Sequence, residues 1–555
     1  MMKSTIQKMI MPALISAHRD GVLPSPDFPE ILIDTPRVES HGDYSTNIAM
    51  MAAARQKMPP KKIAEAIVAR VVDPESIISD IHIAGPGFIN FYLKSSAWHP
   101  ILKKIHEQDK RYGASNHGQG CRIQVEFVSS NPTGPLHVGH GRGAAIGDSL
   151  ANILSFCGYD VQREYYINDS GRQINTLGRS VFLRYTALHG RETVFPDDCY
   201  QGDYILTLAK QLTEDKGEAL LHISEEEAVT YCARFATDII LKGIRDDLKQ
   251  FGVIFDRWYS EQSLYDNGKV DQILEDLRAR NLVYRKDDAL WFRTTAFGDE
   301  KDRVVVRKNG QTTYLASDIA YHRDKYIRGF DRVIDVWGAD HHGYIPRMTA
   351  AIEATGQTRE QFDVILVRLV NLLRGGTPVA MSTRAGEFVT LKDVVNEVGR
   401  DAARFIFLTR HHDSALDFDL EVASQKTNEN PVYYVQYVHA RIASILSKSH
   451  EKGISPVTTD TVDLTTLSTK EEVALMKRMA LLPEVILRSA EQMAPHHVAF
   501  YLMDLAGAFH TYYNKHRVLT DSLKKTHARL YLIMAIQKII RNGLSLLGVA
   551  APEHM

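Results

Sequence analysis

The chain has 555 residues, 44% of them hydrophobic, and a formal net charge of −2 at pH 7. This length predicts about three to four domains with ordinary hydrophobic cores, and a charge so near zero excludes a surface that is basic throughout. No apolar run approaches the roughly 20 residues of a membrane span, and the N-terminus lacks a secretory pattern. We therefore expect a soluble, cytoplasmic protein.

The four cysteines are widely spaced and form no Cys-x-x-Cys pair. This spacing favours packed thiols over a zinc ribbon or a disulfide framework, so we expect no structural metal. Within 501–555, Lys and Arg outnumber Asp and Glu seven to three, for which a solvated helical surface is the simplest explanation.

Residues 1–112 predict a small α+β domain. Apolar spacing favours helices and strands in turn: helices near 3–18, from Ser45 to about 54 and over 60–72, with strands at 31–33, 81–83 and 88–93. The turn at Gly85-Pro86-Gly87 separates the last two strands. A stretch rich in Gly, Ser and Asn over 113–120 then predicts a domain boundary.

Residues 125–143 are the most informative part of the chain. They contain a buried strand, a Pro/Gly turn, the histidines His137 and His140, and a helix start that is poor in side chains. Three glycines leave the N–H groups of the first helical turn uncovered: Gly139, Gly141 and Gly143. Unsatisfied N–H donors and the helix dipole favour phosphate there. The stretch therefore predicts a phosphate-handling site to which the two histidines add donors.

The same residues support a second interpretation. Gly141-x-Gly143-x-x-x-Gly147 follows a strand and opens a helix, as in a dinucleotide-binding turn, and Glu164 lies where an acid that binds ribose is expected. A nicotinamide-dependent oxidoreductase is therefore an alternative hypothesis. It leaves the two histidines unexplained.

Strand and helix patterns alternate from about 120 to about 410, which predicts a parallel α/β sheet with ligands at the carboxyl ends of its strands. Long helical patterns over 180–290 indicate an insertion between the halves of this sheet. Beyond 410 the strand patterns stop. Helical patterns run to Leu547, and Ser468 with Glu471 predicts a capping box, so 411–555 should be all-α.

A second candidate site lies at residues 379–386, after an apolar run and the turn Arg374-Gly375-Gly376. A glycine-flanked loop that carries Ser382 and Arg384 is suited to bring polar and positive groups to a transferring phosphate.

Together, the two sites closely resemble the paired signatures of class I aminoacyl-tRNA synthetases. The resemblance extends to the arginyl-tRNA synthetases over essentially the whole chain. Its motifs occur in the family's order: residues 126–140, 165–173, 314–321, 337–344 and 429–437. Residues 41–47 and 85–88 are similar to the family's N-terminal domain, which touches the elbow of the tRNA. Residues 509–530 resemble its helical anticodon-binding domain.

This resemblance implies a Rossmann-like catalytic domain over 113–410, between the α+β domain of 1–112 and an all-α anticodon-binding domain over 411–555. It implies an arginine–tRNA ligase that uses L-arginine, ATP as its Mg²⁺ complex and tRNA(Arg). Arginine attacks the α-phosphate, and the arginyl-adenylate then acylates the terminal adenosine of the tRNA. A monomer is the family's habit.

The resemblance also assigns roles to individual residues. For the chemistry it indicates four residues: His137, His140, Ser382 and Arg384. For ATP it indicates three: Gly139, Gly141 and Met381. For arginine it indicates five: Glu126, Asn131, Tyr314, Asp318 and His341. A guanidinium is planar with five donors, so carboxylates in forked geometry suit it better than they suit lysine.

Contact with a single-stranded anticodon is expected from aromatic rings beside cations. The candidates are consecutive or nearly so: Tyr512, Tyr513, Asn514, Lys515 and Arg517. Aromatic residues at helical spacing usually lie in a core, so we expect one of the two tyrosines to be buried.

The second signature departs from the common class I pattern Lys-Met-Ser-Lys. Ala380 and Thr383 stand where lysines are usual. Arg384 is the candidate for the cation that meets the β- and γ-phosphates, with Arg307 or Lys308 as substitutes. This departure leaves open a tRNA-binding relative without catalysis. The resemblance implies ATP–pyrophosphate exchange with arginine only, and only when tRNA is present.

Overall fold

The computed structural model describes residues 2–36, 38–379, 389–455 and 461–555, which form two compact units. The first unit contains Met1–Gln108, Ser449–Ala480 and Thr511–Ala535. The second contains Asp109–Lys448, Leu481–His510 and Ile536–Met555. Five residues singled out in the second signature lie outside the described residues: Ala380, Met381, Ser382, Thr383 and Arg384.

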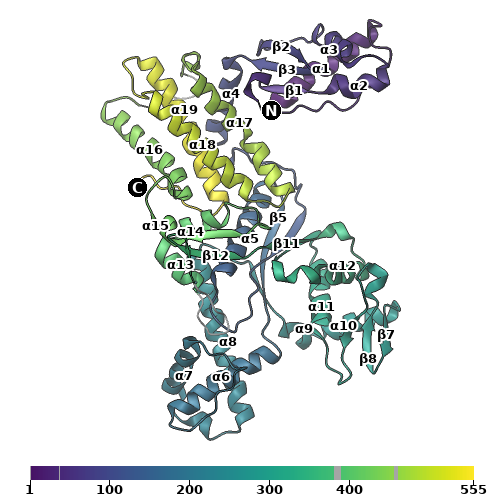
Figure 1. Cartoon of the computed structure of the whole chain (residues 1–555), viewed down its shortest axis with the longest axis vertical. Coiled ribbons are helices and arrows are strands. Elements are labelled where there is room, and N and C mark those ends of the chain that lie inside the picture. The colour runs from purple at the N-terminus through teal and green to yellow at the C-terminus, as the bar shows by residue number, and fades with distance from the viewer. Residues whose placement is uncertain (1, 37, 380–388, 456–460) are drawn as a thin grey trace. The chain divides into compact units, whose positions relative to one another are not determined.

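The first unit has a three-stranded antiparallel sheet in the order β1-β3-β2 (Figure 1). Its strands are β1 (Tyr44–Thr46), β2 (Ile78–Ala84) and β3 (Phe88–Leu93). The helix α3 (Pro60–Val68) packs against β2 and β3, and α1 (Met2–Arg19) and α2 (Ile48–Gln56) pack against α3. Three short elements complete this segment: η1 (Glu39–His41), η2 (Ser95–Trp98) and α4 (His99–Gln108).

The strand predicted at 31–33 is wrong. Ile31 and Ile33 are buried and Leu32 is exposed, which is the alternation of a strand. However, these residues join no ladder, and the main-chain oxygen of Ile31 accepts a hydrogen bond from the Gln7 side chain of α1. Ser45 also lies in β1, so the predicted helix begins later, at Ile48.

The second unit is built on a parallel five-stranded sheet in the order β11-β10-β4-β5-β6, which confirms the predicted fold class. In chain order, its strands are as follows: β4 (Arg122–Glu126), β5 (Asp160–Ile167), β6 (Arg257–Ser260), β10 (Arg332–Gly338) and β11 (Phe362–Val367). The chain adds β5 and β6 on one side of β4, and later β10 and β11 on the other. The order of strands therefore reverses between β4 and β10, where ligands bind in sheets of this kind.

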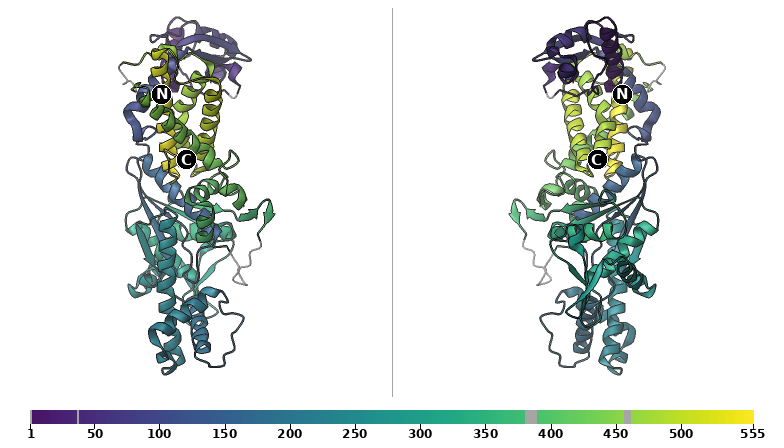
Figure 2. Two further views of the ribbon diagram at one scale, coloured as in Figure 1. Left: turned by 90° about the vertical axis from the view of Figure 1, so that its left-hand side faces the viewer. Right: turned by 90° about the vertical axis from the view of Figure 1, so that its right-hand side faces the viewer.

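Helix α5 (Val138–Phe156) follows β4 and packs against β4, β5 and β10. The helix ends with Cys157 as its cap, followed by Gly158 with a φ of +89°, a left-handed conformation that favours glycine. Between β5 and β6 the chain forms four helical elements: α6 (Arg172–Leu188), α7 (Asp203–Lys216), η4 (Ala219–Leu221) and α8 (Glu225–Gln250). These helices lie together in both views of Figure 2. Because β6 belongs to the main sheet, this helical segment ends before the limit of 290 expected for the insertion.

Between β6 and β10, an antiparallel sheet of order β7-β8-β9 accompanies three helices. In chain order, this segment consists of the following elements: α9 (Gln262–Asp266), α10 (Lys269–Ala279), β7 (Val283–Lys286), β8 (Ala289–Phe292), η5 (Thr294–Phe297), β9 (Arg303–Val306) and α11 (Tyr314–Ile327). After β10 come η6 (Ala339–Tyr344), α12 (Ile345–Ala354) and η7 (Arg359–Gln361). A continuous apolar core joins α10, α11 and α12 to the sheet and fixes the position of α11.

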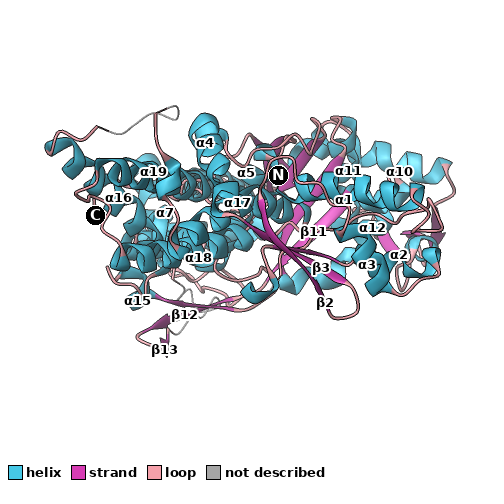
Figure 3. Ribbon diagram, turned by 90° about the horizontal axis from the view of Figure 1, so that it is seen from above, coloured by secondary structure: helices cyan, strands magenta, loops and turns pink. Residues whose placement is uncertain are grey.

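A small sheet of order β13-β12-β14 comes next, and Figure 3 shows β12 and β13 side by side. Its elements and the neighbouring helices have these bounds: β12 (Val370–Arg374), β13 (Thr377–Pro378), α13 (Leu391–Val398), α14 (Arg400–Phe407), β14 (Leu416–Asp419) and α15 (Leu420–Ser424). The strand β14 was not expected, because strand patterns stop at 410. Its residues, Leu416–Asp419, alternate between apolar and polar, but a run of four residues is too short to predict a strand by itself.

The remaining chain is helical, as predicted: η8 (Leu464–Thr466), α16 (Pro431–Glu451), α17 (Lys470–Glu491), α18 (His496–Lys515) and α19 (Leu523–Leu546). The capping box of α17 uses Thr469 and Glu472, one residue later than predicted. Among the described residues, no helix combines the length and the apolar character needed to cross a membrane.

Candidate active site

The chain leaves β4 through a strained turn. Val128 and Ser129 have φ values of +69° and +40°, a conformation that is unfavourable for a β-branched residue. The turn places Ser129 Oγ so that it donates to Glu126 Oε1 at 2.9 Å and accepts the N–H of Tyr166 at 3.1 Å. The two hydrogen bonds of Ser129 in this turn therefore connect the end of β4 to the end of β5.

His137 and His140 lie at the start of α5 with their rings stacked, 3.7 Å apart. His137 Nδ1 accepts the N–H of Gly139 at 3.1 Å, and His140 Nδ1 accepts the N–H of His137 at 3.2 Å. An acceptor nitrogen carries no proton, so each neutral ring bears its proton on Nε2. Burial lowers the pKa of His137. Burial and the neighbouring His137 lower the pKa of His140 to about 3.

The glycines of this helix start differ in their surroundings. A Cβ at Gly141 would lie 2.5 Å from Leu391, and one at Gly147 would lie 2.3 Å from Phe127. A Cβ at Gly143 would meet nothing within 4 Å. Gly141 and Gly147 are thus needed for close packing of α5, which the sequence patterns did not indicate. The part of Gly139 and Gly141 in ATP binding stays a prediction.

The C-terminal flank of the second signature reaches the first. Thr390 forms an antiparallel bridge with His137, and the N–H of Leu391 donates to the Leu136 oxygen at 2.8 Å. Main-chain hydrogen bonding therefore holds residues 390–391, which follow the second signature, beside the first. Of the substitute cations, Lys308 pairs with Asp288 at 3.2 Å, and both side chains are exposed.

Three carboxylates surround the hydroxyl group of Tyr166. They belong to Glu126 at the end of β4, Glu261 directly after β6, and Asp318 in the first turns of α11. Burial and these three charges raise the pKa of Tyr166 well above its usual value. The sequence patterns did not indicate Tyr166 or Glu261. Glu261 follows a strand of the parallel sheet, but that strand is hidden in the stretch interpreted as an insertion.

Glu126 has a counterion within the protein. Lys325, which is fully buried, donates to Glu126 Oε2 at 2.6 Å and to Asp335 Oδ1 at 3.0 Å. His322 Nε2 lies 2.9 Å from Asp335 Oδ2. The attraction of Glu126, Asp335 and Glu164 raises the pKa of Lys325 although burial opposes it. Glu126 therefore belongs to a buried ion-pair network with Lys325 and Asp335.

Asp318 and Glu261 lack such a counterion, since no Lys or Arg of the described residues lies within 4 Å of their carboxylates. Asp318 Oδ2 accepts the hydroxyl of Tyr344 at 2.5 Å, and Glu261 Oε2 accepts the amide of Asn168 at 2.8 Å. Burial raises the pKa of Glu261 and raises that of Asp318 to about 6. Glu261 is buried and Asp318 is half-buried, so neither charge is fully compensated by water or by a cation of the protein.

The other residues expected to bind arginine lie on loops and helix ends. Asn131 Nδ2 donates to Gln173 at 2.6 Å. Tyr314 begins α11 and is 54% exposed. His341 lies on η6 with an exposed side chain, 3.5 Å from Asp340. Their contacts with a substrate stay predictions.

The alternative of a dinucleotide site is wrong. Glu164, the residue expected to bind ribose, is fully buried. Arg328 holds its two oxygens at 2.6 and 2.9 Å, and the hydroxyl of Tyr321 donates to it at 2.7 Å. A carboxylate closed off in this way does not reach a ligand.

Comparison with known families agrees with this geometry. Three models match successive parts of the chain: "Arginyl tRNA synthetase N terminal domain" over 3–93, "tRNA synthetases class I (R), catalytic domain" over 101–443 and "DALR anticodon binding domain" over 435–555. The chain belongs to the arginyl-tRNA synthetases.

Individual arginyl-tRNA synthetases are similar to this chain over most or all of its length. An arginine–tRNA ligase from Desulfosudis oleivorans is 58% identical, and the match covers 100% of both chains. A structure from Campylobacter jejuni, assigned as an arginyl-tRNA synthetase, has 36% identity and a TM-score of 0.76 and covers 83% of this chain and 100% of its own. The Thermus thermophilus arginyl-tRNA synthetase is 24% identical with a TM-score of 0.75, covers 100% of both chains, and supports the fold alone.

The residues predicted to contact the tRNA of this arginyl-tRNA synthetase lie in the first unit. Tyr512 is fully buried, as expected of one of the two tyrosines, so its ring offers no surface on which a base can stack. Its predicted tRNA contact is therefore wrong. Lys515 is exposed and pairs with Glu471 at 2.8 Å, and Asn514 and Arg517 are exposed.

Among the residues that the structure describes, no group of three or more His, Cys, Asp and Glu side chains is arranged to hold a metal ion.

Proposed function

We propose that this chain is an arginine–tRNA ligase. It activates L-arginine with ATP, giving arginyl-adenylate and pyrophosphate, and then transfers arginine to the 3′-terminal adenosine of tRNA(Arg). The observation that carries the choice of amino acid is a pair of carboxylates, the buried Glu261 and the half-buried Asp318, without a Lys or Arg partner in the described part of the chain.

The guanidinium of arginine binds between Asp318 and Glu261. It is planar, always charged and able to donate to two carboxylates in a forked geometry. The ammonium of lysine is a point charge and satisfies only part of such a fork. Glu126, whose charge Lys325 offsets, forms the floor of the pocket and holds Ser129. Tyr314 borders the pocket, and Asn131 and His341 complete it toward solvent.

ATP enters as its Mg²⁺ complex at the N-terminus of α5. His137 and His140 donate from Nε2 to phosphate oxygens, because their Nδ1 atoms are already engaged by main-chain N–H groups. Neutral donors placed in advance stabilise charge that develops on the phosphate oxygens. Ser382 and Arg384 supply further donors from the second signature, together with the main chain at Met381.

The tRNA is recognised by surface residues of the helical C-terminal region. Tyr513 offers a ring for stacking, and three polar or charged neighbours meet the backbone: Asn514, Lys515 and Arg517. The α+β domain of 1–112 meets the elbow of the tRNA, and the chain acts as a cytoplasmic monomer.

The decisive experiment is ATP–pyrophosphate exchange with each of the common amino acids, with and without tRNA(Arg). We expect exchange with arginine alone and only in the presence of tRNA, followed by formation of arginyl-tRNA. Lysine serves as the matched control, because it is cationic but lacks the fork. Binding of tRNA without exchange by any amino acid would contradict the proposal and favour a tRNA-binding protein without catalysis.

A further inference from the structure

One hydrogen bond connects the proposed arginine pocket to the turn after β10. Tyr344, the last residue of η6, donates its hydroxyl to Asp318 Oδ2 of α11 at 2.5 Å. In the described part of the chain, this is the one hydrogen bond that the Asp318 carboxylate receives. A short bond from a phenol to a carboxylate is among the stronger ones in proteins. Tyr344 therefore determines the direction in which Asp318 presents its other oxygen.

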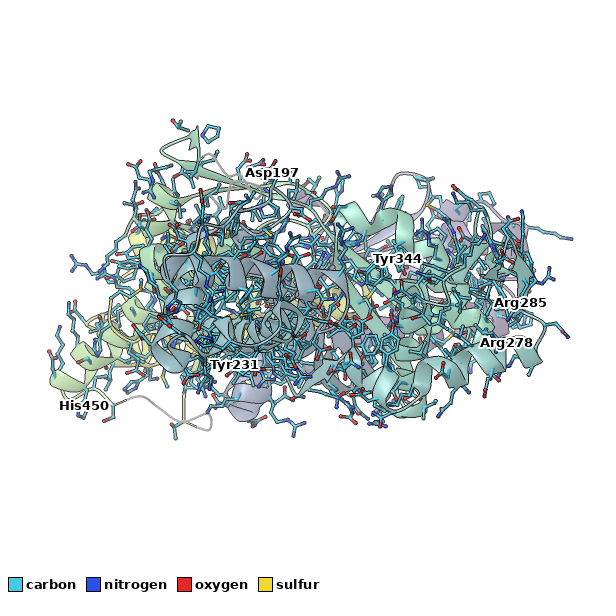
Figure 4. All side chains as sticks on the ribbon, turned by 90° about the horizontal axis from the view of Figure 1, so that it is seen from below. Asp197, Tyr231, Arg278, Arg285, Tyr344 and His450 are labelled. Atoms are coloured by element: carbon cyan, nitrogen blue, oxygen red, sulfur yellow. The ribbon has the colours of Figure 1, made fainter. Side chains whose placement is uncertain are left out.

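The ring of Tyr344 is itself held in place. It packs at the edge of the apolar core that joins α10, α11 and α12. The ring of Trp337 meets it edge-on with centroids 6.2 Å apart, and the Arg347 guanidinium lies 5.3 Å from its centroid. Figure 4 marks Tyr344 in this part of the unit. A ring fixed on two sides gives its hydroxyl a defined position.

The carboxylates of Glu126 and Asp318 are close enough to repel each other, but they have different partners. Lys325 is a cation and offsets the charge of Glu126. Tyr344 is a neutral donor, so its hydrogen bond orients Asp318 and leaves the negative charge in place. A protein cation at the position of Tyr344 would compete with the guanidinium of the substrate.

The groups that face Asp318 explain why a neutral donor matters. They are Glu126, Glu261 and Asp335, which are acidic, together with His322, Tyr166 and Tyr344. Burial and the acidic neighbours raise the pKa of Asp318, whereas the hydrogen bond from Tyr344 lowers it. Without that bond, the protonated form of Asp318, which does not pair with a guanidinium, would be more populated.

We propose that Tyr344 is a positioning residue for arginine selection, which holds Asp318 ionised and aimed at the guanidinium. This inference rests on the proposed function. It predicts an effect on the binding of arginine rather than on the chemical step, because Tyr344 acts through Asp318 and belongs to a different element from the histidines of α5.

The test is steady-state aminoacylation by full-length Tyr344→Phe, with arginine varied at several pH values on both sides of about 6, the pKa of Asp318. We expect the KM for arginine to rise about tenfold at neutral pH with kcat within about twofold, the size of one lost hydrogen bond to a charged group. The acidic limb of kcat/KM should move upward by about one pH unit.

Tyr326→Phe is the matched control. Tyr326 packs against the same core and its hydroxyl also makes one hydrogen bond, to the main-chain oxygen of Gln361 at 3.2 Å. We expect it to keep the wild-type KM and pH profile. Equal changes in both variants would mean that any lost phenol loosens the core, and would overturn the proposal.

A second variant covers the case in which Tyr344→Phe folds poorly. Replacement of Tyr344 by 3-fluorotyrosine keeps the shape of the ring and makes the phenol a stronger donor. The acidic limb should then move downward. If neither variant moves the limb, Tyr344 does not position Asp318. If the wild-type protein fails to charge tRNA with arginine at all, the proposed function falls, and that result is separate from either variant.

Discussion

Two acidic regions of the second unit, one on β5 and one formed by α11 and the end of β6, are built in opposite ways. Glu164 on β5 is fully buried, with Arg328 bound to both of its oxygens and Arg257 3.6 Å away. Glu261 is also buried and Asp318 is half-buried, but among the described side chains they receive only neutral hydrogen-bond donors. The protein supplies cations for the first region, and none of the described residues does so for the second.

This difference teaches how to separate structural from functional carboxylates. Burial alone does not, because Glu261 of the second region is buried almost as fully as Glu164 of the first. The deciding property is whether the protein supplies the cation. A buried charge without a partner is costly, so a chain that keeps Glu261 in this state beside Asp318 has a use for the attraction they exert on a cation from outside.

The largest effect that tests this comparison is expected for Asp318→Asn. The variant keeps the shape of the side chain and removes the charge that faces the guanidinium. Loss of one partner of a buried charge pair predicts a fall in kcat/KM for arginine of at least about 10²-fold. Aminoacylation kinetics measure it. A fall below tenfold would mean that Asp318 is not the guanidinium's partner.

The next effect concerns the region around Glu164. Arg328→Gln leaves Glu164 buried without its main counterion, so the free energy of unfolding should fall by about 3–5 kcal/mol. Denaturant unfolding measures it, and the KM for arginine should change little. Arg257→Gln is the control, since Arg257 is more exposed and farther from Glu164, and it should cost much less. A larger change in arginine KM than in stability would break the comparison.

A third prediction uses the pKa of Asp318, which burial raises to about 6. Only the ionised carboxylate attracts a guanidinium, so arginine binding is complete above this pH and weakens as the pH falls through it. The KM for arginine should rise about tenfold per pH unit below about 6. His140 does not contribute to this limb, because its pKa is lowered to about 3. A KM that is constant down to pH 5 would contradict the assignment.

The smallest effect is expected at the surface. Lys308 and Asp288 form a pair whose side chains are 77% and 75% exposed, and exposed pairs contribute little. Lys308→Ala should change the unfolding midpoint by less than about 2 °C and leave ATP–pyrophosphate exchange unchanged. A large loss of exchange would instead make Lys308 a cation for the phosphates.

The sequence patterns predicted what depends on neighbouring residues. The strand β4 and the start of α5 beside His137 and His140 follow from local periodicity and turn residues, and the structure has them. Lys325 could not be found in this way, because it meets Glu126 across 199 positions of the chain. Ile31 and Ile33 were misleading, since burial alternates there without a neighbouring strand. Tyr512 was assigned a surface role that only its burial in the fold excludes.

The proton positions of His137 and His140 have a consequence for turnover. In the proposed function both rings bind phosphate as neutral hydrogen-bond donors, which hold anions less strongly than full charges do. We therefore expect pyrophosphate to dissociate from this site more readily than it would from a site built on lysines.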